Sequence, residues 1–140
     1  MVYLILEQET QMSRDKLVQF LDQKYISLET YKKNNQPVRT PVWFVEEKGV
    51  FYIRTDERSG KVKRVHNNPH VRLVPCDIRG RVKGDWIDGE AKVSDTLESR
   101  HAHELLNQKY GVRGRIMGIM YRFRKVEFIV LSISLRTSVT

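Results

Sequence analysis

Three strand-like runs follow one another early in the chain, and only short turns separate them. Tyr25–Tyr31, Pro37–Val45 and Val50–Thr55 are rich in β-branched and aromatic residues. The polar stretches Lys33–Gln36 and Glu47–Gly49 lie between them. Parallel strands need a crossover of about a dozen residues or more, usually a helix. The spacing therefore argues against a doubly wound parallel sheet and predicts an antiparallel meander.

The remaining pattern extends this meander into a mainly β fold. Further strands are predicted over Val71–Ile78, Trp86–Val93 and Tyr121–Leu135, and helices over Gln11–Gln23, Lys61–His66 and Asp95–Tyr110. Closing six antiparallel strands into a β-barrel with helical excursions removes most exposed edges. Pro41 has no backbone N–H, so its strand is expected at an edge or leaving its ladder there. We expect one domain over residues 1–140, with a helical segment at 1–23 and a barrel core at 24–136.

Charge and cysteine content limit the partners and the setting. Lys and Arg number 25 against 17 Asp and Glu, a net charge of +8, which favours an anionic partner. The single cysteine, Cys76, cannot form an intrachain disulfide, and it is expected to be a small buried side chain in a reducing, cytoplasmic protein. The apolar start Met1–Leu6 is too short for a signal peptide or a membrane span.

The stretch from Arg54 to Arg64 resembles a phosphate site in outline. A strand end at Arg54 and Thr55 is followed by Ser59 and Gly60 at a helix start, where unpaired N–H groups and the helix dipole favour an anion. Lys61 and Arg64 are three residues apart and share one helix flank. The alternative is a solvated basic helix, and the P-loop pattern is absent.

A second candidate is the stretch Thr40-Pro41-Val42-Trp43. A strand interrupted by proline leaves backbone groups free to contact a planar heterocycle, and Trp43 or Tyr52 could form a wall of that pocket. Core packing alone is the other explanation for these residues.

Metal and nucleic-acid sites are poorly supported by the sequence. His101 and His103 are two residues apart on a predicted helix and so lie on different faces. The cations that could form a basic surface are Arg72, Arg79, Arg81, Lys83, Arg113, Arg115, Arg122, Arg124 and Lys125. Only Trp86 and Tyr121 interleave with them, whereas single-strand binding barrels use several aromatic residues. A nucleic-acid-binding barrel therefore remains a minor alternative.

Several of these segments, in this order, resemble a known family. They are Thr40–Val45, Gly49–Thr55, Ser59–Arg64, Asn68–Asp77, Gly84–Val93 and Lys109–Gly111. The chain from about Tyr25 to Leu135 is similar to the pyridoxamine 5′-phosphate oxidase-like split-barrel family, and within it to the branch described as F420-dependent oxidoreductases. The resemblance implies a six-stranded split β-barrel that forms a homodimer, with FMN or the deazaflavin coenzyme F420 bound at the interface.

The resemblance also implies a role for individual residues. The strand from Thr40 through Pro41 and Val42 to Trp43 would lie against the ring system. The cofactor phosphate would be held by Thr55, Lys61 and Arg64, and the second subunit would contribute Trp86 and Arg122. Arg54, Ser59 and Gly60 of the same stretch are further candidates for cofactor binding.

The implied activity is hydride transfer between the reduced cofactor and a small organic substrate, with no catalytic side chain. Cofactor binding without turnover is the alternative. The chain departs from the vitamin-phosphate oxidases because Leu135–Thr140 lacks their Arg-x-His motif, so we expect no oxidation of pyridoxamine phosphate.

Overall fold

The computed structural model describes residues 14–113, 116, 119 and 127–135. The strands in this part are β1 (Tyr25–Tyr31), β2 (Pro37–Val42), β3 (Val45–Glu47), β4 (Val50–Asp56), β5 (His70–Cys76), β6 (Ile87–Val93) and β7 (Phe128–Leu135). The helices are α2 (Gly60–Asn67) and α3 (Thr96–Tyr110). Within the described residues all strand pairs are antiparallel, in the order β2-β1-β5-β6-β7-β4-β3. The predicted mainly β, antiparallel fold class is confirmed.

The described sheet has seven strands where six were predicted. The run Pro37–Val45, predicted as one strand, contributes to two strands, β2 and β3, which lie at opposite edges of the sheet. β2 pairs with β1 as far as Val42, and β3 pairs with β4 from Val45 onward. Trp43 and Phe44 between them carry the chain from one edge of the sheet to the other. The prediction that the three early runs form one continuous meander is therefore wrong, because β1 and β4 are separated by β5, β6 and β7. Pro41 thus lies in an edge strand, as predicted, where its missing N–H disrupts no central ladder.

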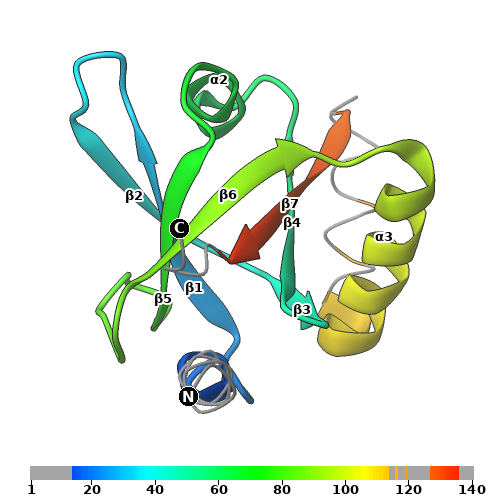
Figure 1. The fold of residues 1–140 in the computed structure, drawn as a ribbon. Coiled ribbons are helices and arrows are strands. Elements are labelled where there is room, and N and C mark those ends of the chain that lie inside the picture. Colours follow the sequence, from blue (N-terminus) through cyan, green and yellow to red (C-terminus); the bar gives the residue numbers. More distant parts are fainter. Residues whose placement is uncertain (1–13, 114–115, 117–118, 120–126, 136–140) are drawn as a thin grey trace, which may run out of the picture.

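The sheet curls strongly, so that α2 and α3 lie on different sides of a half-barrel (Figure 1). α2 packs on β1 and β6 through Val62 and Val65, the two valines predicted to point inward. α3 packs along β3, β4 and β7. The Asp95 side chain accepts a hydrogen bond from the Glu98 N–H at the start of α3, and Gly111 ends that helix, both as predicted.

The ends of several predicted elements differ from the structure. Helix is present at residues 14–18 and gives way to turns, and Leu21, predicted on the buried face, is 63% exposed. The final strand begins at Phe128; residues 121–126, with Arg122, lie outside the described residues. The division at residue 23 and the cytoplasmic setting stay predictions. Among the described helices, none is long and apolar enough to span a bilayer.

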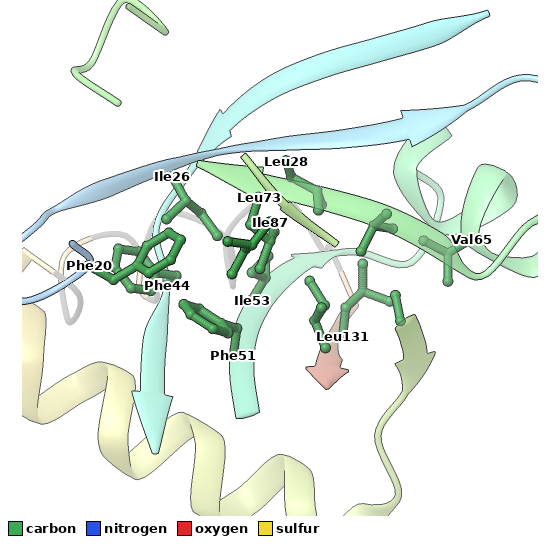
Figure 2. Close-up of a cluster of buried hydrophobic side chains, with 13 residues drawn as sticks. Phe20, Ile26, Leu28, Phe44, Phe51, Ile53, Val65, Leu73, Ile87 and Leu131 are labelled. Carbon is green, nitrogen blue, oxygen red and sulfur yellow. The ribbon is translucent and has the colours of Figure 1, made fainter. Parts of the chain in front are cut away.

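The core fills the concave side of the curled sheet. Phe20, Phe44 and Phe51 form an aromatic group at one end, with the Phe20 and Phe51 ring centroids 4.8 Å apart, and Val65 of α2 lies at the other end (Figure 2). Phe44 is 1% exposed, so the link between β2 and β3 is anchored in the core. Cys76 is buried, as predicted.

Gly89 lies in β6, where neighbouring atoms leave little room for a side chain. A Cβ atom there would be 2.7 Å from Cγ2 of Ile133 and 3.2 Å from the Ser134 carbonyl oxygen. We expect Gly89→Ala to lower the free energy of unfolding by about 1 kcal/mol, because the added methyl overpacks a closed interface. Urea unfolding of this variant beside Lys92→Ala, an exposed position in the same strand, measures the effect. If Gly89→Ala and Lys92→Ala have equal free energies of unfolding, the close packing of Ile133 and Ser134 against Gly89 is contradicted.

Candidate functional site

A cavity of about 350 Å³ opens where the β2–β3 link, the end of β4, the start of α2 and the end of α3 meet. Its lining consists of Tyr25, Pro41, Val42, Trp43, Arg54, Thr55, Asp56, Ser59, Lys61, Leu106, Tyr110 and Phe128. We call it the first cavity. Its volume is at the low end of the range for small-molecule sites. Seven of the residues predicted from the sequence therefore lie around one space.

One wall of the first cavity is apolar and aromatic. Pro41, Val42 and Trp43 line it, and the Trp43 ring stacks on Tyr110 with centroids 4.4 Å apart and planes 6° apart. The Tyr110 hydroxyl accepts a hydrogen bond from the Phe44 N–H and lies 2.8 Å from the carbonyl oxygens of Phe44 and Lys24. Burial raises the pKa of Tyr110, so its hydroxyl stays neutral. These bonds hold the aromatic wall rigidly.

The opposite part of the first cavity is cationic. Arg54 and Lys61 line it with a single carboxylate, Asp56. Burial lowers the pKa of Arg54, and burial together with the Arg64 charge lowers the pKa of Lys61 despite Asp56. None of the ion pairs between described residues involves Arg54 or Lys61. An anion in the cavity would meet two partly desolvated cations.

Arg54 carries a donor without a partner. Its Nη2 lies 3.2 Å from Oδ1 of Asn107 and 3.4 Å from the His103 carbonyl oxygen, which links β4 to α3. Its Nε is buried and has no hydrogen-bond partner among the described residues. Buried polar groups are nearly always satisfied in folded proteins, so an orphaned guanidinium nitrogen beside a cavity indicates a missing acceptor.

The start of α2 leaves its positive end open to the first cavity. The Ser59 side chain makes no capping bond, and no acidic residue lies in the first turn. Instead the Ser59 hydroxyl lies 3.1 Å from Oγ1 of Thr55. Arg64 folds back toward this end, with Nη1 2.6 Å from where a Cβ on Gly60 would be. Because Ser59 and Lys61 both line the first cavity, the start of α2, where N–H groups are uncapped and the helix dipole is positive, lies beside it.

The predicted site residues divide into three groups. Those that line the first cavity are Pro41, Val42, Trp43, Arg54, Thr55, Ser59 and Lys61. Thr40, Gly60 and Arg64 belong to the same segments without lining it, and Arg64 donates a hydrogen bond of 2.6 Å to Oγ1 of Thr30. Trp86 is not part of the lining, and Arg122 lies outside the described residues.

Trp86 belongs to a separate cluster around a buried carboxylate. Glu29 is paired across the sheet with Arg39 of β2 and Arg72 of β5, at 2.8 and 2.7 Å. Both guanidinium carbons lie over the Trp86 ring, 4.6 and 4.8 Å from its centroid. Tyr31 also donates to Glu29. In the described chain, Trp86 covers this cluster rather than the first cavity.

Tyr110 is the main lining residue that the sequence analysis missed. It comes 67 positions after Trp43 and is brought to it only by the packing of α3. Its position before a helix-ending glycine gave no signal for a role in a pocket. Tyr52, considered as a wall residue, instead packs with Ala102 and Val130 beneath α3. In the described part of the chain, no group of three or more His, Cys, Asp or Glu could hold a metal ion.

A family model described as pyridoxamine 5′-phosphate oxidase matches residues 13–134. The chain belongs to this family. The match includes every segment that lines the first cavity. The predicted family membership is confirmed, whereas the F420-dependent branch is a finer assignment that the match does not reach. The sequence matches no curated protein.

Several solved structures share the fold at low sequence identity. The heme storage protein HutZ from Vibrio cholerae has a TM-score of 0.61 and 15% identity, covering 94% of this chain and 90% of that one. A FAD-binding protein from Mesorhizobium loti has a TM-score of 0.61 and 13% identity, covering 89% and 87%. General Stress Protein 26 from Bacillus anthracis has a TM-score of 0.58 and 17% identity, covering 89% and 88%. At these identities the likeness supports the split-barrel fold.

Proposed function

We propose that this protein binds FMN or coenzyme F420 in the first cavity and acts as an oxidoreductase. The observation that carries the proposal is the juxtaposition of an aromatic wall, around Trp43, with a cationic end formed by Arg54, Lys61 and the start of α2. Both cofactors join a planar ring system to a phosphate. The family match and the FAD-binding relative from Mesorhizobium loti support a flavin-type ligand.

The residues that line the first cavity, and their neighbours in the same segments, have proposed roles. Thr40, Pro41, Val42 and Trp43 place backbone and apolar surface against the ring system. Arg54, Thr55, Ser59, Gly60, Lys61 and Arg64 hold the phosphate through cationic groups, hydroxyls and the N–H groups at the start of α2. The unpartnered Nε of Arg54 supports this arrangement, because a phosphate or a nearby ligand oxygen would supply its missing acceptor.

The bound cofactor would supply the hydride chemistry, exchanging hydride with a small organic substrate. The protein would orient the ring on its rigid aromatic wall and exclude water with Val42, Leu106 and Phe128. No side chain need move a proton for this role. The only carboxylate in the described lining, Asp56, already accepts a hydrogen bond from the Arg58 N–H.

A homodimer would complete the site. The first cavity of one chain is small, and Trp86 does not reach it. Trp86 would contact the cofactor as a contribution from a second copy of the chain, and we assign Arg122 to that copy as well. This is the arrangement that we propose.

Binding without turnover is the second candidate, and one observation favours it. The structural relative HutZ is a heme storage protein on the same fold, so the fold also supports a binding role. Under this alternative the protein would bind a reduced cofactor and never pass hydride to any acceptor in a broad panel.

The absorption spectrum and mass of the small molecule that copurifies provide the first test. FMN, F420 and heme are then titrated into the stripped protein, with sedimentation of each complex. We expect FMN or F420 to bind to a dimer at one per chain and heme to bind more weakly. Saturable binding of heme alone, or of none of the three, would overturn the proposal.

A further inference from the structure

A second cavity, of about 500 Å³, lies on the other side of the Trp43–Tyr110 stack. It shares Tyr25, Trp43 and Tyr110 with the first cavity, so the aromatic pair forms a common wall. The rest of its lining includes Lys24, Lys109 and Arg113 with one carboxylate, Asp22. None of the roles proposed above uses this space.

The cations of the second cavity come from separate places in the fold and are not neutralised by ion pairs. Lys24 precedes β1, Lys109 is in the last turn of α3, and Arg113 follows that helix. No ion pair between described residues involves any of the three or Asp22. The described lining therefore carries a net positive charge of two.

Lys109 is the most distinctive of these groups. Its ammonium lies 3.5 Å from the centroid of the Phe44 ring and donates to the Phe44 carbonyl oxygen at 2.8 Å. That bond uses one of three N–H donors. Burial lowers the pKa of Lys109 to about 8, so holding the cation here carries a desolvation cost that an anionic ligand would offset. A lysine that only complemented the helix dipole would lie on the last carbonyls of α3.

We propose that the second cavity binds a carboxylate group of a ligand, held by Lys109, Arg113 and Lys24 beside the aromatic wall. We favour a singly charged carboxylate over a phosphate because the cavity lies at the negative end of α3. The carboxylate belongs either to the glutamate tail of the deazaflavin coenzyme or to a carboxylate substrate bound beside the ring. This proposal rests on the proposed function, because that function identifies the cofactor whose ring would lie beside the carboxylate.

The first arm of the test compares the deazaflavin coenzyme with and without its glutamate tail. Fluorescence titration gives dissociation constants for the wild type, Lys109→Gln, Arg113→Gln and the double variant. Lys63→Gln removes an exposed cation of α2 that lines neither cavity and is the matched control. If the glutamate tail occupies the second cavity, the coenzyme with the tail binds about tenfold more tightly than the coenzyme without it, in both the wild type and the control. In the double variant the two forms then bind with similar dissociation constants.

The second arm tests a carboxylate substrate. 4-Nitrobenzoate and 4-nitrobenzamide are titrated into the FMN-loaded protein while the indole N–H signal of Trp43 is followed by NMR. If a substrate carboxylate occupies the cavity, the acid shifts this signal, the amide does not, and Arg113→Gln weakens binding of the acid about tenfold.

The outcomes separate this proposal from the proposed function. A dependence on Lys109 and Arg113 in either arm supports the carboxylate site and identifies its source, and its absence from both arms overturns it. Should Lys109→Gln fail to fold, Arg113→Gln and Lys24→Gln, at exposed positions, carry the test. If neither FMN nor the deazaflavin binds, the proposed function fails, and the nitrobenzoate titration of the cofactor-free protein still tests the second cavity.

Discussion

Replacing Lys61 with alanine is expected to weaken FMN binding by about 1.5–3 kcal/mol, or roughly ten- to a hundredfold in the dissociation constant. Lys61 lines the cationic end of the first cavity, is only partly exposed, and has its pKa lowered by burial and by Arg64. A phosphate bound at the cationic end of the cavity would offset the electrostatic repulsion between Lys61 and Arg64. Arg64→Ala is expected to weaken binding by a similar amount, because its guanidinium folds over the start of α2.

The control for this prediction is Lys63→Ala, which removes an equal charge from the same helix. Lys63 is exposed and does not line the first cavity. Fluorescence titration at constant ionic strength should leave its affinity for FMN close to that of the wild type. If Lys61→Ala also binds FMN like the wild type, the phosphate is not held at the start of α2.

Glu29→Gln is expected to lower the free energy of unfolding at neutral pH by roughly 2–3 kcal/mol. The Glu29 side chain is 2% exposed. Burial raises the pKa of Glu29, but hydrogen bonds from Arg72, Tyr31 and Arg39, with the Arg72 charge, outweigh it and lower the pKa from 4.5 to about 2. The expected loss is smaller than the full shift implies, because Arg39 and Arg72 are partly solvated.

The same carboxylate makes the stability depend on pH. Its pKa is lower in the folded than in the unfolded protein, so its contribution is complete above about pH 4.5 and is lost as the pH falls toward 2. The difference in unfolding free energy between wild type and Glu29→Gln should therefore shrink over this range. Urea unfolding at several pH values measures it, with Glu90→Gln, an exposed carboxylate of β6, as control. A difference that stays constant down to pH 2 would contradict the assigned ion pairs.

The Glu29 cluster also bears on the first cavity. Arg39 and Pro41 belong to the same edge strand, and Glu29 holds that strand to β1 through a charged bond directly across the ladder. A loosened β2 would shift the wall at Pro41–Trp43. We therefore expect Glu29 to position the wall of the proposed ring site, although it is not part of the described cavity lining.

Local sequence signals predicted most of the helices and strands and about half of the residues that line the first cavity. Proline at position 41 predicted an edge strand, the valines at 62 and 65 predicted the inner face of α2, and Asp95 with Glu98 predicted the start of α3. The cationic residues of the first cavity were also predicted, because Arg54 to Arg64 are neighbours in the chain. The count of strands was wrong, since nothing local in Pro37–Val45 indicates that its two ends pair with opposite edges.

The sequence by itself determined the mainly antiparallel β fold and the basic segment at the start of α2, and it indicated the family. The first two follow from short-range spacing, charge and turn chemistry, whereas the family was indicated by the resemblance of several segments in order. Only the tertiary structure decided which residues face one another across long separations. It stacked Tyr110 on Trp43, set Lys109 over Phe44, and placed Trp86 over the Glu29 cluster instead of the cavity. These contacts depend on how the sheet curls and where α3 packs, which is a collective result of burying the core and is encoded in no single segment.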